Sequence, residues 1–291
     1  MPFHYVNCIA FLLIVSHGGL ALADPPAESR PFAVMHPLPP RDVRWTSGLW
    51  KERFVCCVAG SIPSLNRIMQ GSERSQFLEN FRIAAGLAEG HHRGPDWNDG
   101  DTYKWLETLA SASSQTNDPE LTGTLNRAIE IIAQAQRADG YLHTPVLIQA
   151  RQQPADAEAV PFHNPQQFEM YNFGHLCTAA AVHFEATGER SLLEVAIKAA
   201  DFLDRAFANP DGTLARHAIC PAHYMGLIDL YRVTGDRRYL TLVERWLAMR
   251  DLVASNGGGD DNQDRLPFRQ QRDAVGHAVR ANYLYAGIAD L

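Results

Sequence analysis

Three histidines occupy equivalent places in a repeated pattern, each near the start of an apolar segment with helical periodicity. They are His175, His223 and His277, which follow one another at steps of 48 and 54 residues. In a ring of helix hairpins, equivalent positions of the inner helices converge on one rim. Histidines gathered there could hydrogen-bond sugar hydroxyls or an anion. A lone histidine at a helix start is more often a cap or a core group, but repetition in register favours a binding role for His175 and His277 and leaves His223 undecided.

A fourth histidine, His143, is predicted to lie near the same rim. It follows a strong helical pattern that ends at Asp139 and Gly140, and glycine suits the left-handed residue that stops a helix. The alternative is a helix C-cap followed by an ordinary turn. The number of other histidines predicted on the rim favours the binding role.

Carboxylates and aromatic residues accompany these histidines. The segment WNDGDTYKWLE, residues 97–107, includes Asp99, and the segment EMYNFGH, residues 169–175, includes Glu169 and Tyr171. Sugars stack their apolar face on aromatic rings and donate their hydroxyls to oxygen acceptors, so Asp99, Glu169 and Tyr171 are candidate substrate-binding residues. Asp99 and Glu169 could also form the carboxylate pair of a glycosidase, as a secondary hypothesis.

The sequence predicts no metal site. Residues 96–107 and 260–271 contain alternating oxygen ligands, but both lack the glycine that an EF-hand loop requires. There is no Cys-x-x-Cys spacing. We expect the four cysteines after residue 23 to be buried free thiols, with a disulfide between the last two as the alternative; they are Cys56, Cys57, Cys177 and Cys220.

The elements that must position these residues are helices. Apolar residues recur at steps of three and four over 49–69, 75–89, 103–115, 119–136, 174–187, 191–207, 224–234, 237–250 and 274–291. Loops are expected at 90–101, 139–168, 209–221 and 256–273. The fold class is therefore all-α, an incomplete (α/α)6 toroid of helix hairpins.

The first residues predict export. Residues 1–23 carry no Asp, Glu, Lys or Arg, contain a short apolar run and end in Ala-Leu-Ala, as a secretory signal peptide does. Residues 24–48 are rich in proline, which predicts an extended arm. Residues 49–291 are predicted to form a partial α/α-barrel catalytic domain. We expect a secreted or periplasmic protein without a membrane span. A net charge of −7 and the absence of basic runs argue against nucleic acid as a partner.

At these residues the chain resembles glycoside hydrolase family 127, the β-L-arabinofuranosidase-like enzymes. The strings that carry the resemblance are DGDTYKWLE at 99–107, AQRADGYL at 135–142, YRVTGDRRYL at 231–240 and AVGHAVRA at 274–281. The resemblance implies an (α/α)6 barrel that hydrolyses furanosides of plant cell-wall glycans, pectic or arabinose-containing. It also implies that His143, His175 and His277 contact the sugar.

The same resemblance implies a catalytic centre that this chain does not match. In the family a cysteine nucleophile is held on zinc by a glutamate and further cysteines, and a separate glutamate serves as acid and base. No Glu-x-Cys occurs in this sequence, so the catalytic residues are expected beyond Leu291 and no cofactor is expected in this chain.

Three hypotheses follow. The chain is the N-terminal part of the catalytic domain of an exported glycosidase, or a catalytically inactive carbohydrate-binding module, or a toroid hydrolase that uses Asp99 and Glu169. The apolar pattern continues through Leu284 and Ile288 to Leu291. We therefore expect self-association through the open ends of the barrel.

Overall fold

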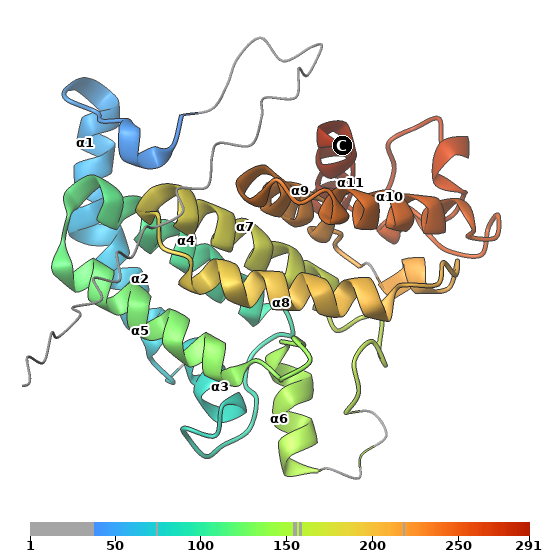
Figure 1. Ribbon diagram of the computed structural model, residues 1–291, viewed down its shortest axis with the longest axis horizontal. Helices are drawn as coiled ribbons and strands as arrows, with labels where there is room; N and C mark the ends of the chain where they lie inside the picture. Colours follow the sequence, from blue (N-terminus) through green and yellow to red (C-terminus); the bar gives the residue numbers. More distant parts are fainter. Residues whose placement is uncertain (1–37, 74, 154–155, 157–158, 218) are drawn as a thin grey trace, which may run out of the picture. The chain divides into compact units, whose positions relative to one another are not determined.

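The computed structural model describes residues 38–291, apart from 74, 154–155, 157–158 and 218. These residues belong to one compact unit, Pro37–Leu291. Every regular element in the described ranges is a helix and none is a strand, which confirms the all-α prediction (Figure 1). The signal peptide predicted for residues 1–23, and the arm as far as residue 37, lie outside the described residues.

Eleven α-helices are described in this part of the chain. They are α1 (Gly48–Cys56), α2 (Ile62–Gln70), α3 (Leu78–Ala84), α4 (Asn98–Thr116), α5 (Pro119–Ala135), α6 (Thr144–Gln152), α7 (Glu169–Thr187), α8 (Ser191–Ala206), α9 (His223–Thr234), α10 (Arg238–Asp251) and α11 (Ala278–Asp290). A π-helical turn, Cys57–Ser61, joins α1 to α2, so the predicted helix at 49–69 is continuous.

The helices form two rows of antiparallel hairpins. An inner row of α4, α7, α9 and α11 packs each helix against the next, and Figure 1 shows the first three side by side. An outer row of α5, α8 and α10 packs against α4, α7 and α9. Gly188 and Gly235 end α7 and α9 with φ of 77° and 71°, as left-handed C-terminal residues. The predicted hairpins are confirmed, whereas closure into a toroid stays a prediction.

Glycines allow the inner helices to approach backbone to backbone. A Cβ on Gly174 of α7 would lie 2.3 Å from the carbonyl carbon of Ala222, and one on Gly226 of α9 would lie 2.2 Å from the Gly174 oxygen. A Cβ on Gly287 of α11 would lie 2.5 Å from the Cβ of Tyr224 on α9. Helix α7 packs against α4, α8 and α9, so it is buried along most of its length.

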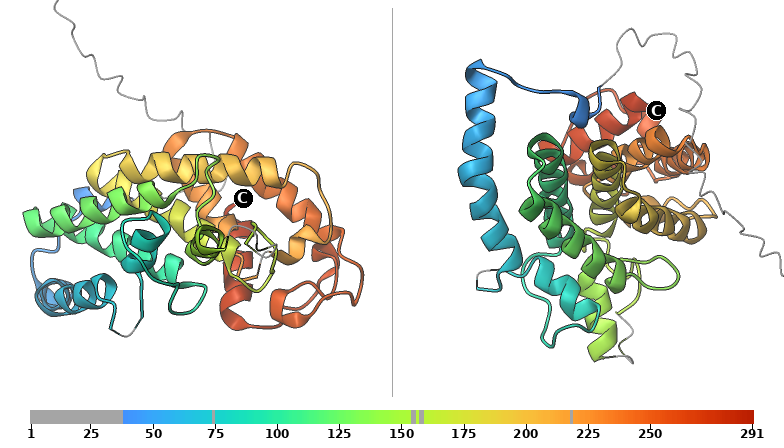
Figure 2. Two further views of the ribbon diagram at one scale, coloured as in Figure 1. Left: turned by 90° about the horizontal axis from the view of Figure 1, so that it is seen from below. Right: turned by 60° about the vertical axis from the view of Figure 1, so that its left-hand side comes forward.

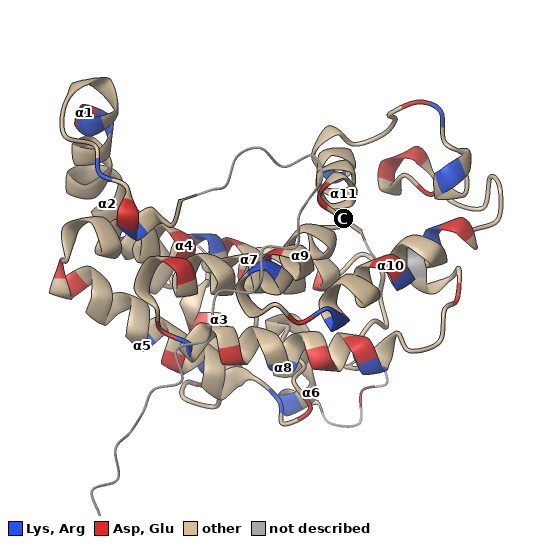
Figure 3. Cartoon of the chain, turned by 45° about the horizontal axis from the view of Figure 1, so that its top comes forward, with Lys and Arg blue, Asp and Glu red and all other residues tan. Residues whose placement is uncertain are grey.

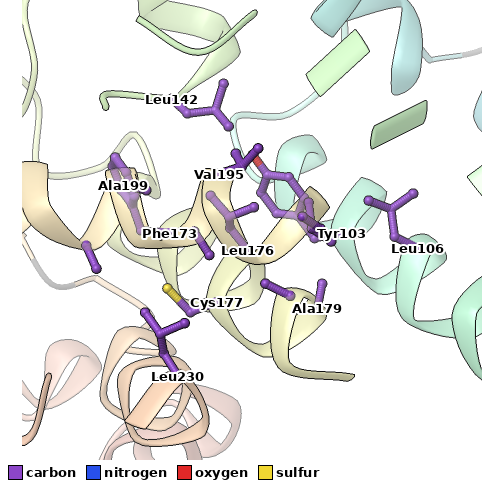
Figure 4. Packing of buried hydrophobic residues seen from close by; sticks show 14 of the residues in the cluster. Tyr103, Leu106, Leu142, Phe173, Leu176, Cys177, Ala179, Val195, Ala199 and Leu230 are labelled. Atoms are coloured by element: carbon purple, nitrogen blue, oxygen red, sulfur yellow. The ribbon is translucent and has the colours of Figure 1, made fainter. Parts of the chain in front are cut away.

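The core lies between the two rows. Figure 4 shows Tyr103, Phe173 and Leu176 gathered near Val195 of the outer row, with Leu106 farther along beyond Tyr103, and all five are buried. Large apolar side chains from both rows interdigitate there, which fixes the orientation of the inner helices.

The cysteines are free, as expected, but only two are buried. Cys177 and Cys220 lie in the interior, while Cys56 is exposed and Cys57 partly exposed. The prediction of burial was wrong for Cys56 and incomplete for Cys57. The reason is that α1 has no buried residue and stands at the edge of the array, as the right-hand view of Figure 2 shows in blue.

The loop predicted at 139–168 contains a helix, α6, that periodicity did not reveal. Thr144 and Pro145 begin it, and proline is well tolerated in the first turn, where its missing N–H leaves no hydrogen bond unmade. Val146, Leu147 and Ile148 are buried. Helix α7 also starts five residues before the predicted Gly174, and α11 starts at Ala278 rather than 274.

Candidate functional site

The N-terminal halves of four helices meet at one place, which we call the rim: those of α4, α6, α7 and α11. The backbone N–H of Gly100 on α4 donates to Oδ1 of Asn172 on α7 at 2.8 Å. The N–H of Thr144 on α6 donates to Asp99 at 2.7 Å. Nε2 of His175 on α7 lies 3.0 Å from the hydroxyl of Tyr283 on α11. Helix N-termini carry partial positive charge, so the rim favours carboxylates and anions.

Asp99 is 1% exposed, and both of its oxygens are bound within the fold. Oδ2 accepts the N–H of Thr144, and Oδ1 accepts the Thr144 hydroxyl at 2.6 Å. The carboxylate thereby caps the first turn of α6 from a neighbouring helix. These contacts assign Asp99 to positioning α6.

Glu169 is 3% exposed and is likewise bound to the fold. Its Oε1 accepts the hydroxyl of Tyr141 at 2.5 Å, and both oxygens accept the N–H of Phe162 at 2.9 Å. Burial raises the pKa of Glu169, against the opposing effects of His143, Tyr141 and Phe162. The carboxyl group fastens the segment before α7 to the start of that helix.

His143 lies fully buried beside Asp99. Its Nδ1 is 3.1 Å from Nδ2 of Asn172 and 3.6 Å from Oδ2 of Asp99. Its Nε2 is buried and has no hydrogen-bond partner among the described residues. An unpaired buried polar atom is unusual in native proteins, so the state of this nitrogen requires an explanation.

His175, Tyr171 and Tyr283 form an aromatic cluster on the rim. The Tyr171 ring meets His175 edge to face with centroids 4.5 Å apart, and Tyr283 completes the group at 5.5 Å from His175. Lys104 of α4 donates to the Tyr171 hydroxyl and to Asp101 at 3.1 Å. Burial, together with Lys104, lowers the pKa of His175 to about 3, so the imidazole is neutral at ordinary pH.

The other two repeated histidines occupy different environments. His277 is the N-cap residue of α11, so its backbone lies at the rim. Its side chain is exposed to solvent. His223 is 1% exposed and packs against Tyr224 and Trp246, with ring centroids 4.4 and 4.7 Å away. Burial and Arg250 hold its pKa well below the usual value. The undecided His223 is therefore a core residue.

Three residues of the rim did not emerge from the sequence: Lys104, Asn172 and Tyr283. Lys104 and Asn172 lie within the segments already selected, but nothing in their spacing indicated that they contact Tyr171 and His143. Tyr283 is on another helix, 108 residues from its partner His175. Contacts of this kind depend on tertiary packing, which a single sequence does not reveal.

The described residues do not fit the zinc centre that the family resemblance implies. Among the described residues, no group of three or more His, Cys, Asp or Glu side chains is arranged so that it could hold a metal ion. Burial raises the pKa of Cys177 to about 12 and that of Cys220 to about 11. A zinc ligand or nucleophile requires a thiolate, so these two thiols are held in the wrong state.

The fold and the rim together define an all-α protein built from helix hairpins, with polar and aromatic side chains of four helices gathered at one place. Residues 42–291 match the GH127 catalytic domain of the β-L-arabinofuranosidases. The chain therefore belongs to glycoside hydrolase family 127.

Three relatives illustrate the similarity. A non-reducing end β-L-arabinofuranosidase of Bifidobacterium longum subsp. longum is 34% identical, over 85% of this chain and 43% of its own length. The GH127 β-L-arabinofuranosidase from Geobacillus stearothermophilus T6 superposes with a TM-score of 0.72 at 31% identity, covering 85% of this chain and 41% of that one. A solved glycoside hydrolase is 42% identical and superposes with a TM-score of 0.61, covering 85% of this chain and 32% of that one. The chain spans less than half the length of each.

Proposed function

We propose that this chain forms the sugar-binding rim of a glycoside hydrolase that acts on β-L-arabinofuranosides of plant cell-wall glycans, pectic or arabinose-containing. The observation that carries the proposal is the cluster of His175, Tyr171 and Tyr283 beside Lys104. Membership of the family and the activity of the similar β-L-arabinofuranosidases support the choice of sugar.

The cluster has the chemistry that furanose binding requires. A neutral imidazole offers one hydrogen-bond donor and one acceptor, and each of the two phenol hydroxyls can both donate and accept a hydrogen bond. The face of a tyrosine ring supplies apolar contact for the C–H face of the sugar. Lys104 is already bound to Tyr171, so its charge orients that hydroxyl before a ligand arrives.

We propose recognition, and not bond cleavage, as the role of the described residues. Asp99 and Glu169 are buried, and their oxygens already accept hydrogen bonds from Thr144, Tyr141 and Phe162. A glycosidase needs one carboxyl group free to protonate the leaving oxygen and another free to act on the sugar. These contacts therefore favour a binding role over the Asp99 and Glu169 hydrolase.

Calorimetry tests this proposal. We expect a disaccharide with a non-reducing β-L-arabinofuranosyl residue to bind, and His175→Ala and Tyr283→Phe to weaken binding at least tenfold, since one lost hydrogen bond in a closed site costs about 1.4 kcal/mol. Glu194→Ala, on the exposed face of α8, is the matched control. Equal affinity for all three variants would contradict the proposal.

We propose in addition that the protein is secreted or periplasmic, because the pattern at residues 1–23 is that of a signal peptide. No described helix is long and apolar enough to cross a membrane. Figure 3 shows acidic and basic residues interspersed over the helices, an unsuitable surface for nucleic acid. Mass spectrometry of exported protein should give an N-terminus at Asp24, and an intact Met1 in the cell interior would count against export.

A further inference from the structure

The side chain of Asn172 has only one possible orientation. Its Oδ1 accepts the N–H of Gly100 at 2.8 Å, and its Nδ2 donates to the carbonyl oxygen of Asp96 at 2.8 Å. A backbone N–H can only donate and a carbonyl can only accept, so exchanging the amide oxygen and nitrogen would break both bonds. Asn172 is fully buried, and no water can substitute for either partner.

This orientation decides which nitrogen of His143 carries the proton. Nδ2 of Asn172 also lies 3.1 Å from Nδ1 of His143. An amide nitrogen cannot accept a hydrogen bond, so Nδ1 must present its lone pair. A neutral imidazole with a lone pair on Nδ1 carries its hydrogen on Nε2.

Asp99 does not compete for that proton. Its Oδ2 is 3.6 Å from Nδ1 of His143, beyond hydrogen-bond distance, and is engaged by Thr144. Glu169 and His92 also lie near enough to interact with His143 electrostatically. Neither forms a described hydrogen bond with the imidazole.

We infer that Asn172 is a positioning residue that holds His143 as the neutral Nε2–H tautomer. The fully buried Nε2, which lacks a partner in the described part of the chain, is then a hydrogen-bond donor. On the proposed function, its partner is an oxygen of the bound sugar, a hydroxyl or the ring oxygen, which reaches Nε2 only when the side chains that cover it move aside. His143 thus recognises an acceptor, whereas His175 and Tyr283 offer both donors and acceptors.

Long-range ¹H–¹⁵N correlation spectra of the ¹⁵N-labelled protein test the tautomer without any sugar. We expect the assigned His143 signals to show a protonated Nε2 and an unprotonated Nδ1 at pH 7.5. A protonated Nδ1 in the unmodified protein would overturn the inference. This measurement requires no variant, so it holds even where substitution at Asn172 prevents folding.

Two variants extend the test. Asn172→Asp replaces the donor by an acceptor and should move the proton to Nδ1, while Asn172→Ala removes the constraint and should give a mixture of tautomers. His175, which Asn172 does not contact, is the internal control and should keep its spectrum. An unchanged Nε2–H form in both folded variants would overturn the inference.

Sugar affinity separates this inference from the proposed function. We expect Asn172→Asp to weaken binding of the arabinofuranosyl disaccharide at least tenfold, because an Nδ1–H tautomer offers a lone pair at Nε2. Full affinity in a variant whose tautomer has switched would overturn the donor role. The Nε2–H form in a protein with no sugar affinity would instead contradict the proposed function and support the tautomer assignment.

Discussion

The carboxylate of Asp99 on α4 accepts both the N–H and the hydroxyl of Thr144 on α6, at 2.7 and 2.6 Å. The N-cap residue of α6, His143, makes no capping bond with its own side chain. The first turn of α6 is thus capped by a residue 45 positions earlier in the chain. One carboxylate therefore fixes both the start of α6 and the backbone of the histidine that precedes it.

Asp99→Asn should destabilise the fold by about 2–3 kcal/mol. The amide can keep its Oδ1 on the N–H of Thr144, but its NH2 group must then donate to the Thr144 hydroxyl, whose own buried hydrogen loses its acceptor. Urea denaturation measures the change. Asp101→Asn, in a partly exposed pair with Lys104, is the control and should cost less than about 1 kcal/mol. Unchanged stability of Asp99→Asn would show that its contacts do not support the fold.

The sequence predicted the hairpins well because their signals are local. Helices α8 and α10 show apolar residues at helical spacing, and Gly188 and Gly235 mark where α7 and α9 end. Helix α6 was missed because Pro145 was interpreted as part of a loop. Its formation depends on Asp99, which is distant in sequence.

The site was predicted less completely, for the same reason. Register predicted His175 and His277 on the rim, but the same argument applied to His223, which is buried against Trp246. A histidine near a helix start can face the rim or the next layer, and only packing distinguishes the two. Asn172 carried no signal at all, since its role depends on a contact 72 residues away.

Gly174→Ala should destabilise the protein by more than about 2 kcal/mol. A methyl group there would lie 2.3 Å from the backbone of Ala222, and two helices would have to separate. Gly123→Ala on α5 is the matched control, because its Cβ would meet only the end of the Arg127 side chain at 3.2 Å. This control should raise stability by about 0.5–1 kcal/mol through helix propensity. Thermal denaturation measures both variants. Melting temperatures that shift by the same amount in Gly174→Ala and Gly123→Ala would contradict the close approach of α7 and α9.

Stability should fall as pH rises between 4.5 and about 7, because burial raises the pKa of Glu107 from 4.5 to about 7. In that range the unfolded chain releases the proton of Glu107 while the folded chain keeps it, so ionisation favours unfolding. Nearby Asp229 adds to the shift and Lys104 opposes it. The loss is at most about 3 kcal/mol, at 1.36 kcal/mol per pKa unit.

Glu107→Gln removes this titration and should be the more stable protein at pH 8, with little difference at pH 4.5. Glu130→Gln, an exposed carboxylate of α5, should leave the pH profile unchanged. Urea denaturation at a series of pH values measures the stability of the two variants and of the unmodified protein. Parallel profiles for Glu107→Gln and the unmodified protein would contradict the buried position of this group.

Removal of metal ions should leave sugar affinity unchanged. The proposed contacts come from His175, Tyr171 and Tyr283 directly, and the described cysteines do not fit a zinc site. Calorimetry before and after dialysis against EDTA measures this. A tenfold loss that added zinc restores would show that the rim depends on a metal.

The exposed apolar side chains of α1 should drive self-association. Leu49, Trp50 and Val55 are 59%, 67% and 50% exposed, and α1 contributes no buried residue to the fold. Apolar surface gathered on one short helix is the kind of patch that mediates association, since each Å² removed from water stabilises a contact by about 25 cal/mol. The π-helical turn that follows, Cys57–Ser61, also contributes no buried side chain.

Sedimentation equilibrium tests this with Trp50→Lys and Val55→Lys combined. We expect the unmodified protein to associate and to bind the dye anilinonaphthalene sulfonate, and the double variant to be monomeric with weaker dye binding. Leu252→Lys is the matched control: its side chain is 56% exposed but lies beyond α10, away from α1, so it should associate as the unmodified protein does. Monomeric unmodified protein without dye binding would show that isolated apolar side chains on α1 are too few to hold two copies together, and that the edge of the array at α1 is stable in water as it stands.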